Sequence, residues 1–453
     1  MASPLPASWN ERLALDRAHV WHPFTQMKEH EAEPPVPVVG GEGCDLLLAD
    51  GRRVLDGISS WWTSVHGHGH PRLVEALSKQ AARLDHVLFA GFTHEPALEL
   101  VARLRPWLPA GLTRAFFSDN GSTAVEVALK MAFQAQLQRG ERGRDRFGAL
   151  QGGYHGDTLG AVAVGDRSNF LTGLFAPLLL ACDALEVMED PRREIGGEAS
   201  EISAALDGER ARIRAWFGAR GPRLAAFIAE PLLQGAGGMR MWPPELLQEI
   251  RLQCDRHGVF LILDEVMTGF GRTGSFLALE QAAVAPDLLC LSKGLTGGVL
   301  PLAMTWATEE IYGHFWGDYS EMRTFFHGHS FTGNPVACAV ACASLALFEE
   351  TPVLERARDL SAALRQAWAG LAGHPATRNV RTLGCVAACR VVDPATGQPH
   401  PAEARFPRRL HREALDRGLL ARPIGDCLYL MPPIATAPGR VLKAVETLAE
   451  LIN

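Results

Sequence analysis

Two nearly unbroken apolar runs, each followed by a charged residue, constrain the fold of this 453-residue chain more than any other feature. Residues 259–263 (VFLIL) precede Asp264, and residues 287–292 (DLLCLS) precede Lys293. Runs of this kind are typical of strands that are buried on both faces of a parallel sheet. Because ligands bind at the carboxyl ends of such strands, we expect Asp264 and Lys293 to face one site. Two ordinary surface charges that follow strands are the alternative interpretation.

The two charged residues suit a cofactor that carries a carbonyl group. The amine of Lys293 can form an imine with such a carbonyl, and the carboxylate of Asp264 can accept a hydrogen bond from a protonated ring nitrogen. The negative charge of Asp264 would keep that nitrogen protonated, which makes the ring an acceptor of electrons. Lys293, once released by an incoming amine, would act as the base that moves a proton.

From residue 72 onward the chain alternates amphipathic and apolar segments, which predicts helices that alternate with strands. This alternation is typical of a parallel sheet that helices cover on both faces. Thr123 and Glu126 have the spacing of a capping box. The predicted helices cover residues 72–87, 95–105 and 123–138, and the predicted strands cover 115–117, 147–150 and 224–229. The predicted class is therefore α/β with a mainly parallel central sheet.

The two ends of the chain predict a second, smaller unit. Near the N-terminus, Asp50-Gly51 is a hairpin signal between two alternating segments. Near the C-terminus, strands are predicted near 380–392 and 426–431, and helices near 405–417 and 438–451. We therefore expect residues 1–70 and 336–453 to form one small α+β domain beside a large domain of residues 71–335.

Composition argues against several classes of partner. The chain has 51 acids and 44 bases, a formal charge of -7, and no dense run of either sign. This balance argues against nucleic acid or an anionic membrane as the main partner. No segment approaches the roughly 18 consecutive apolar residues of a membrane helix, and the N-terminal residues have no signal-peptide core. The nine cysteines lack framework spacing and are expected to be buried free thiols of a cytoplasmic protein.

The histidines His66, His68 and His70 alternate with glycines, which invites a metal-site interpretation. However, no carboxylate or cysteine stands beside them in the sequence, and the glycines and Pro71 favour a turn. We therefore expect a turn at this place and no metal site.

A phosphate site is expected where the first of these strands meets the helix that follows it. In the turn SDNGS, Gly121 allows the backbone to approach an anion, Ser122 offers a hydroxyl, and the helix N-terminus directs its amides at the same point. Tyr154 follows the next strand and can stack on a flat ring, although a packed core aromatic has the same pattern. Glu230 follows a third strand and is expected to hold an arginine.

The motifs at the two apolar runs, DEVMTGFGRTG at 264–274 and SKGLTGG at 292–298, resemble the signature of class III pyridoxal-phosphate aminotransferases. Further motifs in the same order extend the resemblance over essentially the whole chain. They are WHPFTQM at 21–27, SSWW at 59–62, NGS at 120–122, GYHGDT at 153–158, QGAGGMRM at 234–241 and RPIG at 422–425. The resemblance implies a fold-type I transferase with pyridoxal 5′-phosphate as its cofactor.

The resemblance implies a role for each matching residue of the cofactor site. Lys293 matches the lysine that forms the imine with the cofactor, and Asp264 matches the partner of the ring nitrogen. Gly121 and Ser122 match the turn that binds the cofactor phosphate. Tyr154 matches the residue that stacks on the ring and also meets the substrate. Lys293, Asp264 and Tyr154 are therefore the expected catalytic residues.

The resemblance also places residues around the substrate. Trp61 and Trp62 match the wall of the substrate pocket, and Arg422 matches the arginine that binds the substrate carboxylate, for which a guanidinium fork is suited. Phe24 is expected at the substrate as well, but members of the family often carry tyrosine there, so a hydroxyl is missing. Met267 replaces a smaller or polar residue beside the cofactor.

A homodimer with shared active sites is implied by the segment Gly328-His329-Ser330. It matches the segment that reaches the cofactor phosphate from the second subunit, and Gly328 is also expected near the substrate. The family commonly has Gly-Pro-Thr here, so Ser330 keeps the hydroxyl whereas His329 changes the backbone.

Within the family, the motifs resemble members that aminate 8-amino-7-oxononanoate to 7,8-diaminononanoate in biotin synthesis. The double tryptophan is similar to members that use S-adenosyl-L-methionine as amino donor, and this donor is the expected one. Phe24 and the Gly-His-Ser segment are similar to members that use lysine, so lysine is the alternative donor. The cofactor motifs by themselves also fit a broad ω-amino acid:pyruvate aminotransferase, which needs neither Trp61-Trp62 nor WHPFTQM. A non-catalytic protein that retains the fold would have no reason to keep the expected catalytic residues together.

Overall fold

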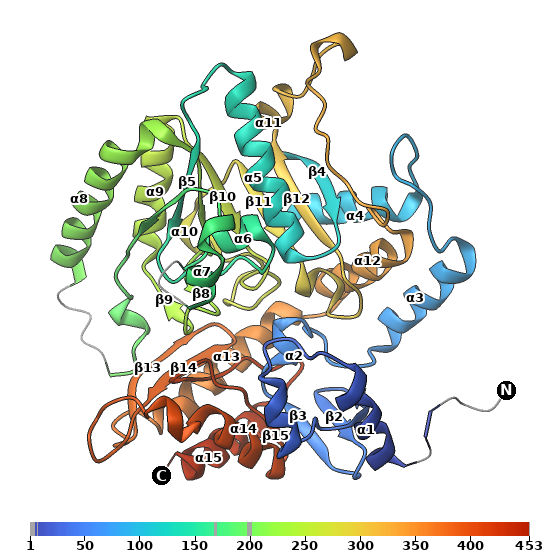
Figure 1. Cartoon of the computed structure of the whole chain (residues 1–453), viewed down its shortest axis with the longest axis vertical. Helices are drawn as coiled ribbons and strands as arrows, with labels where there is room; N and C mark the ends of the chain where they lie inside the picture. Colours follow the sequence, from blue (N-terminus) through green and yellow to red (C-terminus); the bar gives the residue numbers. More distant parts are fainter. Residues whose placement is uncertain (1–4, 7, 167–169, 197–201, 453) are drawn as a thin grey trace.

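A seven-stranded sheet lies at the centre of the larger part of the protein (Figure 1). The computed structural model describes residues 5–6, 8–166, 170–196 and 202–452. The sheet has the order β4-β12-β11-β10-β7-β5-β6, and all its pairs are parallel except those of β12 with β11 and β4. Its strands are β4 (Leu112–Ser118), β5 (Arg146–Leu150), β6 (Cys182–Leu185), β7 (Leu224–Ala229), β10 (Phe260–Asp264), β11 (Leu288–Leu291) and β12 (Ala303–Thr308). The predicted α/β class with a mainly parallel sheet is confirmed.

Helices pack on both faces of this sheet (Figure 1). The predicted helices 72–87, 95–105 and 123–138 correspond to α3, α4 and α5. The helices of the larger part are α3 (Pro71–Arg83), α4 (Glu95–Leu104), α5 (Gly121–Gln138), α6 (Leu159–Ala163), α7 (Phe170–Phe175), α8 (Ile202–Arg220), α9 (Pro244–His257), α10 (Leu279–Ala282), α11 (Glu309–Gly313) and α12 (Pro335–Glu350).

Strand β10 explains why the apolar runs are unbroken. Phe260 and Ile262 belong to the core that contains α5, whereas Leu261 and Leu263 belong to the core that contains α9 and α12. Because successive side chains of a strand point to opposite faces, a strand between two helical layers needs apolar residues at every position. Burial of each such side chain contributes roughly 1.5–3 kcal/mol.

The two ends of the chain share a second sheet in the smaller part, with the order β1-β2-β3-β15. Its strands are β1 (Val38–Glu42), β2 (Asp45–Leu48), β3 (Arg53–Asp56) and β15 (Leu419–Leu420). The hairpin predicted at Asp50-Gly51 joins β2 to β3, and β15 pairs parallel to β3 with Leu420 opposite Asp56. Figure 1 accordingly shows the N-terminal strands beside the C-terminal helices. The domain boundaries at residues 70 and 335 stay a prediction.

The other elements complete the smaller part and the segments that border the larger one. The strands are β8 (Leu233–Gln234), β9 (Arg240–Met241), β13 (Thr377–Leu383), β14 (Val386–Val391) and β16 (Cys427–Leu430). The helices are α1 (Trp9–His19), η1 (Met27–Glu31), η6 (Lys293–Thr296), α13 (Val353–Ala369), α14 (Phe406–Asp416) and α15 (Pro438–Leu451). The short element labelled α2 (Ser59–Trp62) is a left-handed turn.

The cysteines and the apolar helices of the described residues bear on two expectations from the sequence. All nine cysteines are free and buried, as predicted. Within the described ranges, no single helix has both the length and the apolar composition to cross a membrane; only α12 and α13 taken together do, and they are bent by 75° at their junction. Residues 1–4 and 7, which belong to the N-terminal stretch without a signal-peptide core, lie outside the described residues.

The histidine-glycine segment forms the predicted turn. Gly67 and Gly69 have positive φ angles of 88° and 63°, which glycine adopts without a steric cost. His66 Nε2 lies 3.0 Å from the hydroxyl of Ser344, and His68 instead points to Asp56. His66 and His68 therefore take part in separate hydrogen bonds.

Candidate active site

Four adjacent parallel strands deliver their following residues to one edge of the large sheet. In the order β11, β10, β7 and β5 these are Lys293, Asp264, Glu230 and Tyr154 with His155. Asp264 is the last residue of β10, and it stands opposite Cys290 of β11 in the parallel register. The sheet therefore brings together residues that are far apart in the sequence, as the strand pattern predicts.

Asp264 is buried and has a buried histidine as its partner. Its Oδ2 lies 2.7 Å from Nδ1 of His155, and its Oδ1 accepts the backbone N–H of Val266 at 2.9 Å. Burial opposes the charged form of His155, but the hydrogen bond to Asp264 and the charge of Asp264 outweigh it and raise the pKa of His155. Sequence reasoning missed His155 as a site residue, and its position beside Tyr154 was the only signal.

Lys293 begins the 3-10 helix η6 and has a left-handed φ of 48°. Its Nζ lies 4.7 Å from the centre of the Trp62 ring. Burial lowers the pKa of Lys293 to about 8, although Asp264 and Glu230 oppose this change. A lysine with this pKa is partly neutral near neutral pH and can act as a base.

Glu230 is buried and holds backbone amides, which corrects the expectation that it binds an arginine. Its Oε2 accepts the N–H of Tyr154 at 3.0 Å, and its Oε1 accepts the N–H of Gly235 at 2.9 Å. Burial raises the pKa of Glu230 to about 7. Glu230 therefore fixes the loop that carries Tyr154 and the loop that carries Gly235.

The predicted phosphate turn lies at the N-terminus of α5, whose first amides have no acceptor within the helix. The helix begins at Gly121 and is capped by Asn120, which exchanges hydrogen bonds with Thr123. The capping box predicted from Thr123 and Glu126 is therefore wrong. Glu126 instead accepts the N–H of Gly160 at 2.7 Å, because the start of α6 lies beside it.

The loop after β5 packs closely on this helix N-terminus. Ser122 Oγ accepts the N–H of Asp157 at 3.3 Å, and a Cβ placed on Gly156 would lie 1.9 Å from that oxygen. Tyr154 is half-buried in the same loop, and its hydroxyl donates to Asp157 at 3.0 Å. Burial, followed by the charge of Asp157, raises the pKa of Tyr154. Tyr154 and Ser122 are thus held close together.

The two tryptophans belong to a left-handed turn. The φ angles of Ser59, Ser60, Trp61 and Trp62 are 52°, 46°, 70° and 72°. An L-residue in this conformation costs roughly 1–2 kcal/mol, so the turn requires support from its surroundings. Trp62 is buried and Trp61 is 39% exposed, so that the two rings face different surroundings.

Trp61 joins two of the predicted substrate residues. Its ring lies 5.1 Å from the guanidinium carbon of Arg422 and makes an edge-on contact with Phe24, at 5.6 Å between ring centres. In the described part of the chain no carboxylate pairs with Arg422, whose side chain is exposed. Phe24, Trp61 and Arg422 therefore form an open cluster that can receive an anionic ligand.

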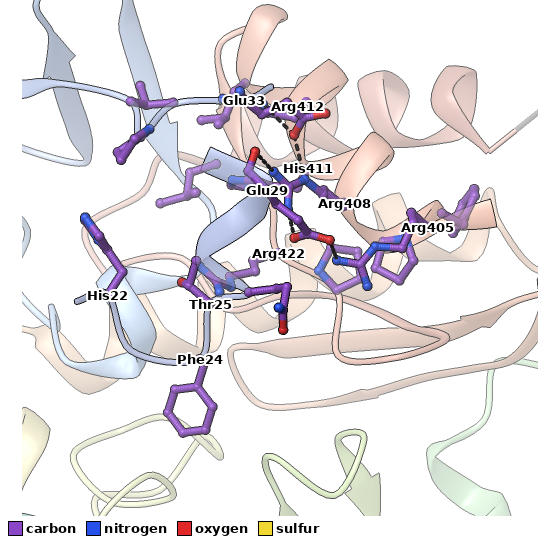
Figure 2. A pocket seen from close by; sticks show the side chains of 18 of the residues that line it. His22, Phe24, Thr25, Glu29, Glu33, Arg405, Arg408, His411, Arg412 and Arg422 are labelled. Atoms are coloured by element: carbon purple, nitrogen blue, oxygen red, sulfur yellow. Dashed lines mark hydrogen bonds and ion pairs between the residues drawn. The ribbon is translucent and has the colours of Figure 1, made fainter. Parts of the chain in front are cut away.

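A cavity of about 880 Å³ extends from Phe24 and Arg422 toward α14 (Figure 2). Ion pairs line the side near α14: Arg408 contacts Glu29 of η1 and Glu33 just beyond it, and Arg405 also pairs with Glu29. Lys293, Asp264 and Tyr154 do not line this cavity. It therefore adjoins the predicted substrate cluster and not the sheet edge.

The segment Gly328-His329-Ser330 is not brought to the sheet edge within one chain. Gly328 and Ser330 are exposed, and among the described residues no hydrogen bond or ion pair joins the three residues to Lys293 or Asp264. The His329 N–H instead donates to Thr332 at 3.1 Å.

Met267 lies beside the tryptophan turn. It is buried, and a Cβ placed on Gly235 would lie 2.4 Å from its terminal methyl carbon and 3.5 Å from the Trp62 ring. Met267 and Trp62 therefore line the same wall of the site, and Gly235 leaves room for both.

The residues at the sheet edge fit pyridoxal phosphate. The start of α5 offers amides to a phosphate, and the absence of a side chain at Gly156 lets the loop after β5 pack against Ser122 there. Asp264 offers a buried carboxylate to a protonated ring nitrogen, and Lys293 offers an amine whose pKa is about 8 to a carbonyl. The donor set therefore matches the phosphate, the ring nitrogen and the carbonyl of this cofactor.

Comparisons with known proteins agree with this arrangement. The aminotransferase class-III family matches residues 26–452. An adenosylmethionine-8-amino-7-oxononanoate aminotransferase from Synechococcus elongatus is 46% identical, over 96% of this chain and 98% of the relative. The crystal structure of the enzyme of that name from Methanocaldococcus jannaschii is 33% identical, covers 98% of each chain and has a TM-score of 0.90. A PLP-bound amine transaminase from an uncultivated Pseudomonas species is 32% identical, covers 96% of this chain and 99% of its own, and has a TM-score of 0.86. The chain therefore belongs to the class III aminotransferase family and is a transaminase.

Proposed function

We propose that this transaminase uses pyridoxal 5′-phosphate to aminate the C7 ketone of 8-amino-7-oxononanoate, which gives 7,8-diaminononanoate, with S-adenosyl-L-methionine as amino donor. The observation that carries the proposal is the tryptophan turn, which places Trp62 over the Lys293 amine and Trp61 against Phe24 and Arg422. The names of relatives at 33–46% identity over nearly the whole chain support the same step of biotin synthesis.

The sheet edge carries the chemistry. When bound, the cofactor supplies an electron-accepting ring that stabilises negative charge on the carbon that loses a proton. The Asp264 carboxylate, which is oriented by His155, would accept a hydrogen bond from the ring nitrogen and keep it protonated. Lys293, as a neutral amine, would remove the proton from the carbon that bears the amino group of the donor and, in the second half-reaction, deliver a proton to the C7 carbon of the acceptor. Tyr154, whose backbone N–H is held by Glu230, would flank the ring.

The tryptophan turn and the arginine bind the substrate. Arg422 takes the carboxylate of 8-amino-7-oxononanoate as a bidentate partner, and Trp61 and Phe24 cover the alkyl chain. Trp62 keeps water away from the Lys293 amine. This arrangement suits a long substrate with a carboxylate at one end and a ketone at the other.

We also propose a homodimer in which Gly328, His329 and Ser330 reach the cofactor phosphate of the second subunit. The exposure of Gly328 and Ser330, and the absence of a hydrogen bond from the three residues to Lys293 in the described part of the chain, support this role. The nine free buried cysteines support a cytoplasmic location, where thiols stay reduced.

The donor half-reaction tests the proposal. S-adenosylmethionine should bleach the absorbance of the cofactor-loaded enzyme within one turnover, and 8-amino-7-oxononanoate should restore it. Lysine and a simple ω-amine are tested side by side at equal concentration. Bleaching by lysine but not by S-adenosylmethionine would reassign the donor. Bleaching by the ω-amine, with recovery on pyruvate but no response to either proposed substrate, would overturn the function.

A further inference from the structure

The tryptophan turn is held from inside the protein by one buried carboxylate, that of Asp56. Asp56 ends β3, has no exposed surface and accepts four hydrogen bonds. Its Oδ2 accepts the Ser60 hydroxyl at 2.7 Å and lies 2.9 Å from Nε2 of His68. Its Oδ1 accepts the N–H of Ser60 at 2.9 Å and that of Ile58 at 3.3 Å. The backbone N–H and the hydroxyl of Ser60 therefore both donate to Asp56.

His68 fixes the orientation of this carboxylate. Its ring is anchored in the glycine turn, where its backbone exchanges hydrogen bonds of 3.1 Å and 2.6 Å with Gly43. Burial alone would raise the pKa of Asp56, but the hydrogen bonds from His68 and Ser60 outweigh burial and lower it. Asp56 is therefore an ionised acceptor at the pH where the enzyme works.

Two further side-chain hydrogen bonds hold the ends of the turn, whereas Ser60 in its middle has Asp56 and, through its carbonyl, the Thr63 hydroxyl at 3.3 Å as partners. The Ser59 hydroxyl donates to the carbonyl of Met431 at 2.7 Å, and the Trp62 indole donates to the Tyr429 hydroxyl at 3.1 Å. Ser60, between these anchors, has a φ of 46° although it is not glycine. Ser60 therefore shares the strain of this turn, and the two hydrogen bonds from Ser60 to Asp56 compensate for it.

The tryptophan turn also positions both parts of the substrate site, the part at Arg422 and the part at Lys293. Trp61 contacts Phe24 and Arg422, and Trp62 lies over the Lys293 amine. A change in the backbone of Ser60 would move both rings together, because the rings are on the next two residues of the same turn.

We propose that Asp56 is a positioning residue, whose buried carboxylate holds Ser60 in the left-handed turn and thereby places Trp61 and Trp62 at the substrate and at Lys293. The proposal rests on the proposed function for its effect on substrate, but not for its effect on the turn. Asp56 touches neither substrate nor cofactor and acts only through the two tryptophans.

Kinetics of three variants test the effect on substrate. Asp56→Ala removes all four hydrogen bonds and should raise the KM for 8-amino-7-oxononanoate by at least about 10-fold, because small displacements of positioning groups have effects of up to about 100-fold. Asp56→Asn should stay within about 3-fold of wild type, since its amide can accept from the two backbone N–H groups and donate to Ser60 and His68. Asp45→Ala is the matched control, because Asp45 is also buried in this sheet but pairs with Arg53 and Arg440.

Ser60→Gly provides the rescue. Glycine adopts a positive φ without a steric cost, so Asp56→Ala combined with Ser60→Gly should return the KM to within about 3-fold of wild type. If Asp56→Ala alone does not fold, this double variant takes its place, and its folding with a normal KM supports the proposal. A double variant that stays unfolded, or that keeps the raised KM, would overturn it.

Near-ultraviolet circular dichroism of the cofactor-free protein tests the turn without any turnover. Asp56→Ala should change the tryptophan signal, and the change should disappear in a Trp61→Phe/Trp62→Phe background. An unchanged signal, or a change that persists without the two tryptophans, would contradict a role in the turn. If the signal behaves as expected but the wild-type enzyme does not aminate 8-amino-7-oxononanoate, the proposed function fails and the positioning role stands. An unchanged KM in Asp56→Ala of an active enzyme would refute the effect on substrate.

Discussion

The two sides of the active site are built in different ways. On the sheet side, Asp264 and Glu230 are buried at the ends of strands inside the large core. On the other side, Phe24 is 56% exposed and Trp61 is 39% exposed, and both have left-handed backbone conformations. Buried strands hold charged groups in fixed positions, whereas turns and termini can change with little effect on the core. We infer that the sheet side carries the chemistry that class III members share, and that the turn side selects the substrate.

Lys293→Ala should have the largest effect. Without the amine, both half-reactions should slow by at least about 10³-fold, because the proton transfer loses its base. Rapid-mixing absorbance measurements with each substrate check this loss, and circular dichroism checks the fold. Lys443→Ala is the control and should be fully active, since Lys443 is an exposed residue of α15. A variant that retains a tenth of the wild-type rate would show that the sheet side does not depend on Lys293.

The pKa of Lys293 should be visible in its reactivity. The chain has five lysines, and burial lowers the pKa of Lys293 to about 8 from the ordinary 10.5. Labelling of cofactor-free protein with an amine reagent should therefore be half-maximal near pH 8 at Lys293, rising with pH as the amine loses its proton. Below pH 8 this lysine should react about 100-fold faster than an equally accessible ordinary lysine. Peptide mass spectrometry measures the extent of labelling at Lys293 and at the reference Lys443 as a function of pH. Equal pH profiles of the two lysines would contradict the lowered pKa of Lys293.

Asp264→Asn should reduce kcat by about 100-fold and leave the KM for 8-amino-7-oxononanoate within a few-fold. The side chain keeps its shape but loses the charge that stabilises the ring nitrogen in the transition state. Steady-state kinetics separate the two constants. Asp183→Asn is the control. It removes the charge of another aspartate of the same sheet, which lies within β6 and pairs with Arg146. A larger change in KM than in kcat would place Asp264 on the recognition side.

Arg422→Ala should show the opposite pattern. A hydrogen-bonded charge pair contributes about 1.5–3 kcal/mol, so the KM for 8-amino-7-oxononanoate should rise about 10-fold to 100-fold while kcat changes less. The donor half-reaction of a simple ω-amine without a carboxylate should be unaffected. Arg417→Ala, which removes an exposed ion pair with Glu450, is the control. If both substrates lose affinity equally, Arg422 supports the fold of the site and does not bind a carboxylate.

Phe24→Tyr should have the smallest effect. Phe24 is more than half exposed, so the added hydroxyl has room and should change kcat/KM by less than about 3-fold. The rates of this variant with S-adenosylmethionine and with lysine show whether residue 24 influences the choice of amino donor. A switch of donor would show that a single hydroxyl selects it.

The sheet side was largely predictable from the sequence. The run 259–263 and its neighbour 287–292 are apolar at nearly every position, which only doubly covered strands require, and the structure has β10 and β11 there. Strand β12 was not predicted, since its residues AMTWAT mix small, polar and aromatic side chains. The pairing of His155 with Asp264 joins residues 109 positions apart and leaves no local pattern.

On the turn side, the sequence predicted which residues take part but not the conformation of the backbone that carries them. Nothing in SSWW signals a left-handed turn, because none of the four residues is glycine or asparagine. The turn exists because Asp56, Met431 and Tyr429 hold it, and two of these come from the other end of the chain. The capping residue of α5 was misassigned for a related reason. The carboxylate of Glu126 accepts a hydrogen bond from Gly160 at the start of α6 and therefore does not cap α5. Contacts between distant segments override local propensity in both cases.

The most direct test of the central claim is mass-spectrometric detection of the product. The cofactor-loaded enzyme is incubated with 8-amino-7-oxononanoate and either S-adenosylmethionine, lysine or a simple ω-amine, at equal concentrations and for equal times. We expect 7,8-diaminononanoate to form with S-adenosylmethionine and at most weakly with the other two donors. No 7,8-diaminononanoate with any donor, from an enzyme that aminates pyruvate at the expense of the ω-amine, would contradict it.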